Sequence, residues 1–198
     1  MRDTLLLDAD DLSRTLDRLA RQLLELWAPE ERPEGDAVGL VGLQTRGVPL
    51  AHRLANRLRR FEGLEVPVGA LDATLYRDDT RRVLASLRPT NVPFNVEGRH
   101  LVLVDDVLYT GRSARAALDA LTDLGRPASV RLAVLVDRGL RELPIRADLV
   151  GRVVPTRPGQ RIRVRLAELD AEEGVWLTEV TKDERRGASE PFTRTLDF

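Results

Sequence analysis

The chain has 198 residues, no cysteine and a formal net charge of −1. This length suits one well-packed α/β domain, and the absence of cysteine excludes disulfides and fits a reducing cytoplasm. The near-neutral charge excludes a globally basic nucleic-acid binder, so an RNA site would have to be a local patch, and no apolar run is long enough to cross a bilayer.

The first predicted element is a helix over residues 10–27, because leucines recur there at helical spacing. A second stripe on this helix consists of Arg14, Arg18 and Arg21. Such a stripe is typical of a solvated helix face, and a cationic stripe can also contact an anionic polymer. A loop rich in proline and acidic residues separates this helix from the next element.

Residues 38–43 predict a buried strand, and the motif Gln44-Thr45-Arg46-Gly47 follows it at the start of the next helix. Gly47 suits a tight turn, and Thr45 and Arg46 can hold an anion at the end of the strand. A plain strand-to-helix turn would not need Arg46. The motif therefore indicates an anion site.

The next two segments are less regular. Residues 66–76 alternate weakly between apolar and polar types and predict a strand. Residues 77–98 carry mixed charge and two prolines without a clear period. A loop this long in a compact domain is usually functional or disordered, so it is a candidate functional loop.

The most informative stretch runs from Leu101 to Ser113, where four aliphatic residues precede Asp105 and Asp106. The aliphatic run predicts a strand buried on both faces of a parallel sheet. We expect the two acids at the end of this strand and a helix from about Ser113. Ligands of open α/β sheets bind at that edge.

The turn after the two acids has the composition of a phosphate site. Gly111 allows a tight bend, and residues 109–113 can present successive N–H groups at a helix N-terminus. Asp105 and Asp106 can accept hydrogen bonds from ribose hydroxyls and help to hold Mg²⁺. A sugar phosphate would satisfy both halves of the motif. The alternative is a helix-capping turn, which leaves the adjacent acids without a partner.

The remaining elements complete an α/β pattern with a central, mostly parallel sheet flanked by helices. Residues 112–124 predict a helix, and residues 130–136 predict a buried strand that delivers Asp137-Arg138-Gly139 to the same edge of the sheet. Residues 162–177 alternate like a hairpin. Residues 178–198 are polar and predict a poorly ordered extension to which we assign no function.

Four separated motifs resemble the PyrR family of type I phosphoribosyltransferases. Leu101–Ser113 resembles the motif with which that superfamily binds phosphoribosyl pyrophosphate (PRPP). The other three motifs are Gln44–Leu50, Leu75–Asp79 and Val136–Asp148. The resemblance covers about residues 5–177. Proteins of this family are uracil phosphoribosyltransferases, and in many bacteria they also bind RNA as attenuators of pyrimidine operons.

The resemblance implies a type I phosphoribosyltransferase fold over residues 1–177, with a flexible loop at about 77–98 and a small hood at about 138–156. It implies catalytic roles for Asp105, Asp106 and Arg46. It places PRPP or nucleotide on Thr45, Arg46, Asp105, Asp106, Val107, Leu108, Tyr109, Thr110, Gly111, Arg112 and Ser113.

The remaining implied roles concern the loop, the base and RNA. The base of the flexible loop is Tyr76, Arg77 and Asp78, and the uracil contacts are Arg138 and backbone groups near Val154. The RNA candidates are Arg14, Arg18, Arg21, Arg141, Arg146 and Arg152. Mg²⁺ would bind through PRPP, without a dedicated protein cage.

The enzyme hypothesis is that uracil and PRPP give UMP and diphosphate, without a covalent enzyme intermediate. Tyr109 stands where many purine phosphoribosyltransferases have an aspartate, which weighs against hypoxanthine or guanine. The flexible-loop sequence weighs against orotate, because it resembles the pyrimidine regulator instead.

The regulatory hypothesis is binding to a pyrimidine-operon mRNA leader under the control of UMP or UTP. It can coexist with catalysis, or the chain can be a weakly catalytic or non-catalytic nucleotide sensor that binds RNA. Two residues depart from the family, because Asp17 stands where it often has threonine and Leu140 where it often has histidine. The resemblance also implies a homodimer or a larger homo-oligomer.

Overall fold

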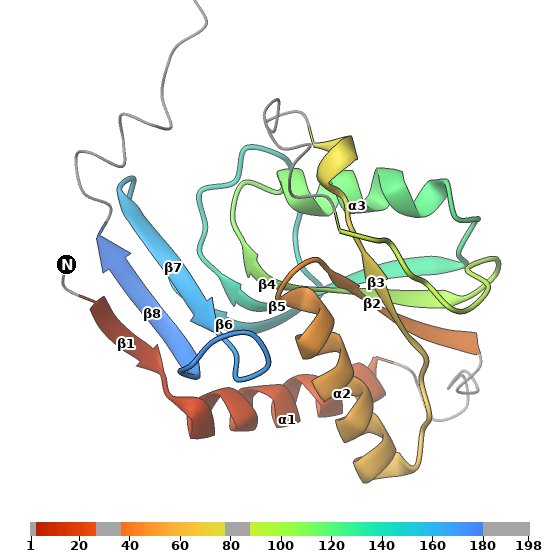
Figure 1. Ribbon diagram of the computed structural model, residues 1–198, viewed down its shortest axis with the longest axis horizontal. Helices are drawn as coiled ribbons and strands as arrows, with labels where there is room; N and C mark the ends of the chain where they lie inside the picture. The colour runs from red at the N-terminus through yellow and green to blue at the C-terminus, as the bar shows by residue number, and fades with distance from the viewer. Residues whose placement is uncertain (1–2, 27–36, 78–87, 180–198) are drawn as a thin grey trace, which may run out of the picture.

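The structure is a computed structural model that describes residues 3–26, 37–77 and 88–179 (Figure 1). Its elements, in chain order, are β1 (Asp3–Leu7), α1 (Ala9–Glu25), β2 (Val38–Leu43), α2 (Gly47–Glu62), β3 (Val68–Leu71), the 3₁₀ helix η2 (Thr74–Tyr76), β4 (His100–Leu108), α3 (Arg112–Thr122), β5 (Ser129–Asp137), β6 (Leu149–Val153), β7 (Gln160–Arg165) and β8 (Gly174–Glu179). In the part of the chain that it describes, no helix is long and apolar enough to cross a membrane.

A five-stranded sheet in the order β3-β2-β4-β5-β6 forms the centre of the fold. Each neighbouring pair of strands is parallel, which confirms the predicted α/β architecture. Every residue of β2 is buried, as expected of a strand that is covered on both faces. Because the strands are parallel, the carboxyl ends of β2, β4 and β5 lie at one edge, where ligands bind in such folds.

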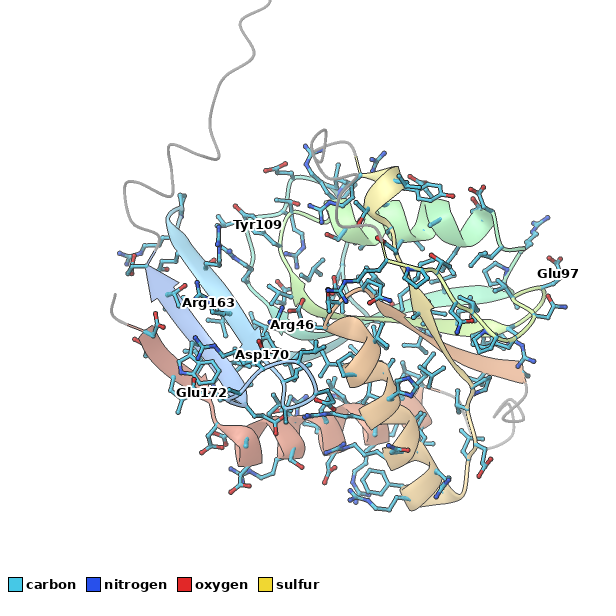
Figure 2. The ribbon with its side chains drawn as sticks, viewed as in Figure 1. Arg46, Glu97, Tyr109, Arg163, Asp170 and Glu172 are labelled. Atoms are coloured by element: carbon cyan, nitrogen blue, oxygen red, sulfur yellow. The ribbon has the colours of Figure 1, made fainter. Side chains whose placement is uncertain are left out.

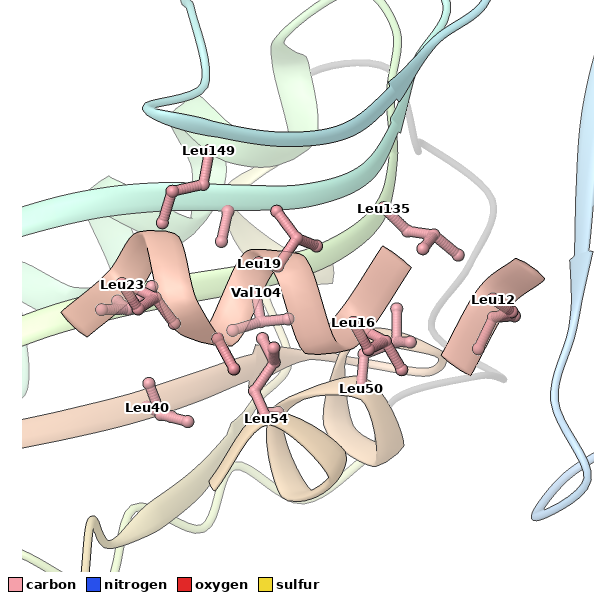
Figure 3. Packing of buried hydrophobic residues seen from close by; sticks show 14 of the residues in the cluster. Leu12, Leu16, Leu19, Leu23, Leu40, Leu50, Leu54, Val104, Leu135 and Leu149 are labelled. Carbon is pink, nitrogen blue, oxygen red and sulfur yellow. The ribbon is translucent and has the colours of Figure 1, made fainter. Parts of the chain in front are cut away.

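Helices cover both faces of this sheet (Figure 1). The leucines of α1 and α2 join one core with β2, β4 and β5, and Figure 3 shows Leu16, Leu19 and Leu54 in this cluster with Val104 and Leu135. Helix α3 covers the other face mainly through alanines, whose small side chains let the helix lie close to the strands. The core therefore has two layers, with β4 buried between them.

A second, three-stranded sheet has the order β1-β8-β7 (Figure 1). The antiparallel β7–β8 pair is the predicted hairpin, whereas the pairing of β1 with β8 was not predicted. Ile162, Val164 and Val175 place one side of this sheet in the same core as α1 and α2. Because β8 runs to Glu179, the predicted polar extension begins after this strand, and residues 180–198 lie outside the described residues.

Strand β4 is longer than the aliphatic run predicts. We expected the two acids where the strand ends, but the strand continues past Asp105 and Asp106 as far as Leu108. The reason is that its main chain continues to pair with β5 as far as the partners Leu108 and Asp137. The two carboxylates are therefore held on a regular strand and not on a loop.

The predicted strand over residues 66–76 is shorter, because β3 ends at Leu71. The carboxylate of Asp72 accepts a hydrogen bond from the Thr74 N–H at 2.9 Å, which starts the turn into η2. Part of the loop expected at 77–98 is also ordered against the fold. Val96 is buried, and Val92 and Phe94 pack against the α3 core, while residues 78–87 lie outside the described part.

The segment expected to form a hood over residues 138–156 divides into two parts. Residues 149–153 form β6, which pairs in parallel with β5 and is the fifth strand of the central sheet. Residues 138–148 run beside the turn that follows β4 and are hydrogen-bonded to it. Of these two parts, only residues 138–148 stand outside the central sheet.

Two glycines bring the start of α2 close to the strands that it covers. A Cβ atom on Gly47 would lie 2.2 Å from the Val104 carbonyl oxygen of β4, and one on Gly42 would lie 2.4 Å from the Val48 Cα atom. These separations are far below van der Waals contact. Any larger residue would push the Gln44–Gly47 turn away from the two carboxylates of β4.

We predict that Gly47→Ala lowers the free energy of unfolding by about 1–3 kcal/mol, because the new methyl group overpacks against the β4 main chain. Urea unfolding followed by circular dichroism measures this change. His52→Ala, at an exposed site on the same helix, is the matched control and should alter stability by less than about 0.5 kcal/mol. An unchanged or raised stability of Gly47→Ala would contradict the close packing.

Candidate active site

Two adjacent clefts open at the carboxyl edge of the parallel sheet. The larger one, of about 580 Å³, lies between the end of β4, the start of α3 and β7. The smaller one, of about 200 Å³, lies between the ends of β2, β3 and β4. Arg77, Asp105, Val107 and Ser113 line both clefts, and Asp106 lines the smaller one. The carboxylate of Asp105 therefore stands where the two clefts meet.

The two carboxylates on β4 are in an unfavourable electrostatic position. Burial, and then the adjacent Asp106, raise the pKa of Asp105 well above its ordinary value of 3.8. Burial also raises the pKa of Asp106, although the positive charge of Arg46 opposes this rise. The Asp106 N–H donates to Asp105 Oδ1 at 2.9 Å. This part of the cleft is suited to hydroxyl donors and cations, which would favour the charged form of both groups.

The turn after β4 has its carbonyl groups fixed on one side. The Leu108 carbonyl accepts from the Arg138 N–H at 3.1 Å, and the Thr110 carbonyl accepts from the Glu142 N–H at 3.0 Å. Arg141 Nη1 donates to the Tyr109 carbonyl at 2.6 Å. In a trans peptide the N–H points opposite to the carbonyl. The N–H groups of residues 109–111 are therefore turned away from segment 138–143 and toward the larger cleft.

The start of α3 completes an anion site beside this turn. Gly111 has a φ of 93°, in the left-handed region that glycine tolerates, and directly precedes the helix. Arg77 Nη1 donates to Ser113 Oγ at 2.8 Å, and Arg112 pairs with Glu142 at 2.8 Å. Thr110, Arg112 and Ser113 all line the larger cleft. A helix N-terminus with neighbouring cations and hydroxyls favours a phosphate.

A buried arginine supports the wall of the larger cleft. Arg138 is 7% exposed, its Nε donates to Thr156 Oγ1 at 3.0 Å and its Nη2 donates to the Gln160 carbonyl at 2.6 Å. Its guanidinium lies 4.0 Å from the centroid of the Tyr109 ring. Arg138, which we expected to contact the base, thus holds the Tyr109 ring. The Val154 N–H is already used, because it donates to the Asp137 carbonyl at 2.8 Å.

The structure separates the residues expected at the base of the flexible loop. Arg77 lines both clefts, whereas the Tyr76 hydroxyl donates to Asp123 near the C-terminus of α3, and Tyr76 lines neither cleft. Asp78 lies outside the described residues. Of the two residues of this group that the structure describes, Arg77 lines the clefts and Tyr76 does not.

The Gln44–Gly47 turn reaches the smaller cleft through Gln44, one of its lining residues. Thr45 and Arg46 do not line either of these two clefts. Arg46 instead pairs with Asp170 in the turn between β7 and β8, at 2.9 Å. Its charge is nevertheless close enough to Asp106 to oppose the rise of the Asp106 pKa. The predicted anion-binding arginine lies next to the acids, with its own acidic partner.

Some of the RNA candidates lie together on the face made by α1 and β6. Arg18 donates to the Gly151 carbonyl of β6, and Arg152 of β6 donates to the Leu6 carbonyl. Arg14 is exposed and pairs with Asp11 at 2.7 Å, and Arg21 lies 4.5 Å from the centroid of the Phe61 ring. We call these four residues, Arg14, Arg18, Arg21 and Arg152, the α1–β6 arginines.

The other two RNA candidates lie elsewhere. Arg141 is held within the chain, because its guanidinium pairs with Asp137 and donates to the Tyr109 carbonyl. Arg146 lies on the α3 side, in a shallow pocket with Leu118. Asp17 of α1 stands where the family often has threonine. Its negative charge is neutralised, because it pairs with Arg57 at 2.6 Å and with Arg60 at 3.0 Å. A carboxylate at this position would repel a nearby phosphate, and these two cations offset that repulsion.

Sequence reasoning missed three residues that the structure brings to the site. Arg161 lines the larger cleft from β7, Asp72 lines the smaller one, and Asp170 pairs with Arg46. Arg161 belongs to the alternating cations of the hairpin, a pattern that also describes a plain solvated face. Asp170 is one of several acids in the predicted turn, and its sequence pattern gives no sign of a distant partner.

Comparisons with known proteins show the family to which the chain belongs. The phosphoribosyl transferase domain family matches residues 6–160. The bifunctional protein PyrR of Thermus thermophilus is 53% identical over 176 residues, which cover 88% of this chain and 94% of that protein. The bifunctional protein PyrR of Corynebacterium diphtheriae is 49% identical over 183 residues, which cover 90% of this chain and 94% of that protein.

Solved structures with the same fold are more distant in sequence. A hypoxanthine phosphoribosyltransferase of Trypanosoma cruzi, in a ternary complex with substrates, has a TM-score of 0.69 and 15% identity and covers 91% of this chain and 96% of its own. A hypoxanthine-guanine phosphoribosyltransferase of Bacillus anthracis has a TM-score of 0.65 and 16% identity, with coverages of 91% and 100%. At these identities the likeness shows the fold alone, and it confirms the predicted phosphoribosyltransferase fold.

The raised pKa of Asp105 predicts a specific pH dependence of stability. Between the unfolded value near 3.8 and the higher folded value, the folded ligand-free chain binds more protons, so its stability falls as pH rises through this window. Asp105→Asn should therefore raise the melting temperature at pH 7–8, and the difference should vanish below about pH 4. Asp119→Asn, at an exposed site on α3, is the control. A melting temperature of Asp105→Asn that is lowered at neutral pH would contradict the unfavourable burial of the charged Asp105 carboxylate.

Proposed function

The chain belongs to the PyrR family of phosphoribosyltransferases, and we propose on that premise that it transfers the phosphoribosyl group of PRPP to uracil, giving UMP and diphosphate. The observation that carries this proposal is the pairing of two features at the adjoining clefts. The backbone N–H groups of residues 109–111 face the larger cleft from one side, and the carboxylates of Asp105 and Asp106 stand on the adjoining strand.

The substrate fits these features in one orientation. The 5′-phosphate of PRPP lies on the N–H groups and hydroxyls of residues 109–113, where the N-terminus of α3 favours an anion. The ribose hydroxyls donate to Asp105 and Asp106, and such hydrogen bonds would offset the cost that burial imposes on the charged forms of these groups. The diphosphate then points to the smaller cleft, beside Gln44 and Arg77, with Arg46 behind it.

In the reaction the C1′–O bond to diphosphate breaks, the C1′–N1 bond to uracil forms, and the N1 proton is released. Positive charge develops on the sugar as diphosphate departs, and the paired carboxylates stabilise it from fixed positions on β4. The ring of Tyr109, held by Arg138, forms the wall against which uracil is placed. Holding N1 near C1′ supplies part of the rate increase, because the two reactants no longer need to meet in solution.

Mg²⁺ fits the donors at this edge of the sheet, because carboxylate oxygens are its preferred protein ligands and a cation would favour the charged forms that burial disfavours in both acids. Among the described residues, no group of three or more His, Cys, Asp or Glu could hold a metal ion on its own. We propose that Mg²⁺ arrives with PRPP and is held by Asp105 and Asp106, directly or through water. It would neutralise charge on the departing diphosphate.

The decisive test is formation of UMP from uracil and PRPP with Mg²⁺. We predict uracil-dependent turnover by the native chain, and a fall in kcat/KM of at least about 100-fold in Asp106→Asn and in Arg46→Ala, because each removes a charge that stabilises the transition state. Asp119→Asn should match the native chain. Hypoxanthine, guanine and orotate serve as alternative acceptors. Native protein that makes no UMP from uracil would overturn the proposed enzyme.

The second proposed function is regulatory. We propose that the α1–β6 arginines form part of a surface that binds a pyrimidine-operon mRNA leader when UMP or UTP occupies the cleft. The supporting observation is that Arg18 and Arg152 are tied to the backbone of neighbouring elements, so that the cations are gathered in fixed positions. A homodimer or larger homo-oligomer would extend this surface. The neutralisation of Asp17 by Arg57 and Arg60 also favours an anionic partner here.

We predict that the double variant Arg14→Ala, Arg21→Ala binds leader RNA more weakly. The slope of log affinity against log salt concentration should become shallower, by about one for each phosphate that the variant no longer neutralises. UMP formation should be unchanged, because both residues lie away from the clefts. Filter binding at several salt concentrations, with UMP or UTP present, measures the effect.

Arg126→Ala, exposed at the amino-terminal edge of the sheet, is the matched control for RNA binding and should behave like the native chain. Equal RNA affinity of the double variant and the native chain would rule out this surface.

A further inference from the structure

The turn between β7 and β8 is fixed to the amino-terminal part of α2. Arg53 of α2 pairs with Glu168 at 2.7 Å and also with Glu173, and these two acids flank Asp170 in the turn. The side chain of Arg53 is only 19% exposed, so these ion pairs are partly shielded from water. The second sheet is thereby attached to the helix that begins at the Gln44–Gly47 turn.

Within this attachment, Asp170 holds Arg46. Both carboxylate oxygens of Asp170 accept from Arg46 Nη2, at 2.9 and 3.1 Å, and Figure 2 shows the two residues between β7 and α2. The two residues are 124 positions apart in the sequence. The pair therefore joins the second sheet directly to the predicted diphosphate loop.

Asp170 is itself held by the main chain of its turn. Its Oδ2 accepts from the Leu166 N–H at 3.0 Å, and its own N–H donates to the Leu166 carbonyl at 2.7 Å. Burial disfavours its charged form, but the Leu166 N–H and Arg46 outweigh this effect and lower the pKa of Asp170. The carboxylate is thus ionised and fixed before any ligand binds.

Arg46 retains donors that Asp170 does not use. The ion pair occupies Nη2, and within the described part of the chain the buried Nε atom has no hydrogen-bond partner. The charge of Arg46 also acts on Asp106, on the strand that lines the smaller cleft. The Arg46 side chain is 34% exposed, so an anion could approach the rest of the guanidinium without displacing Asp170.

We propose that Asp170 is a positioning residue of the diphosphate site, which holds the Arg46 guanidinium ready for the diphosphate of PRPP. The inference rests on the proposed function and extends it, because it gives the second sheet a role in binding diphosphate. An arginine that is already fixed loses less side-chain freedom when its ligand binds, so the ligand binds more tightly. Asp170 touches Arg46 and not the substrate.

The opposite arrangement makes a different prediction. If Asp170 occupied the place of a diphosphate oxygen, the ligand would have to displace it, and removing Asp170 would tighten binding. The hydrogen bonds that fix Asp170 within its turn, and the ion pairs that fix the turn to α2, favour a permanent support. The sign of the change in affinity distinguishes the two arrangements.

The test combines calorimetric titration with Mg²⁺-diphosphate and steady-state kinetics of UMP formation, both on the full chain. We expect Asp170→Ala to weaken diphosphate binding and raise the KM for PRPP by about tenfold, the usual effect of losing one hydrogen-bonded charge. The KM for uracil and kcat at saturating PRPP should change little. Asp170→Asn keeps an acceptor for Arg46 and should restore most of the affinity.

Two controls isolate the contact. Glu172→Ala removes an exposed acid from the same turn, one that pairs with Arg165, and should leave diphosphate binding unchanged. In an Arg46→Ala background, Asp170→Ala should have no further effect on diphosphate affinity, because the residue acts through Arg46. Melting temperatures of all variants show whether the turn remains folded.

The outcomes separate this inference from the function on which it rests. Native protein that neither binds diphosphate nor makes UMP would overturn both. Native protein that does both, together with an Asp170→Ala variant of equal or higher diphosphate affinity, would overturn only the positioning role. An equal loss of affinity in Asp170→Ala with and without Arg46 would also overturn it, because the effect would then not pass through the arginine.

Discussion

The rest of the structure depends on the placement of two adjacent carboxylates inside a buried parallel strand. Continued pairing of β4 with β5 holds Asp105 and Asp106 on regular backbone, where burial raises the pKa of both and the charge of Asp106 raises that of Asp105 further. A chain that keeps such a pair without compensation loses stability. Two arginines of the neighbouring loops compensate in part, because the charge of Arg46 stabilises the ionised form of Asp106 and the charge of Arg77 stabilises that of Asp105.

The backbone N–H groups that face the larger cleft are oriented by hydrogen bonds on the opposite side of the same peptides. The carbonyl groups of residues 108–110 are all occupied by segment 138–143, so the opposite faces of these peptides are left for a ligand. Arg138 holds the Tyr109 ring, and Asp170 holds Arg46. The second sheet contributes to the site through Arg161 and Asp170 although it shares no strand with the central sheet. Preorganisation of this kind reduces the reorganisation that the reaction requires.

The sequence predicts those parts of the site that are local. The aliphatic run before Asp105, the glycine turn and the Gln44–Gly47 motif each carry their own pattern, and the parallel sheet follows from them. Long-range contacts have no such pattern. The pairing of β1 with β8, the neutralisation of Asp17 by α2 and the Arg46–Asp170 ion pair join segments far apart in the chain. The contacts of Arg141 with the Tyr109 carbonyl and Asp137 have no sequence pattern either, because such an arginine looks the same in sequence as an exposed one.

The most direct test of the proposed site is a crystal structure of the protein with UMP, Mg²⁺ and diphosphate. We expect the 5′-phosphate on the N–H groups of residues 109–113 and the ribose hydroxyls on Asp105 and Asp106. We also expect diphosphate beside Gln44 and Arg46, with the Arg46–Asp170 pair intact. A nucleotide bound away from β4, or a diphosphate that contacts neither the Gln44–Gly47 turn nor Arg46, would contradict this placement of the substrates.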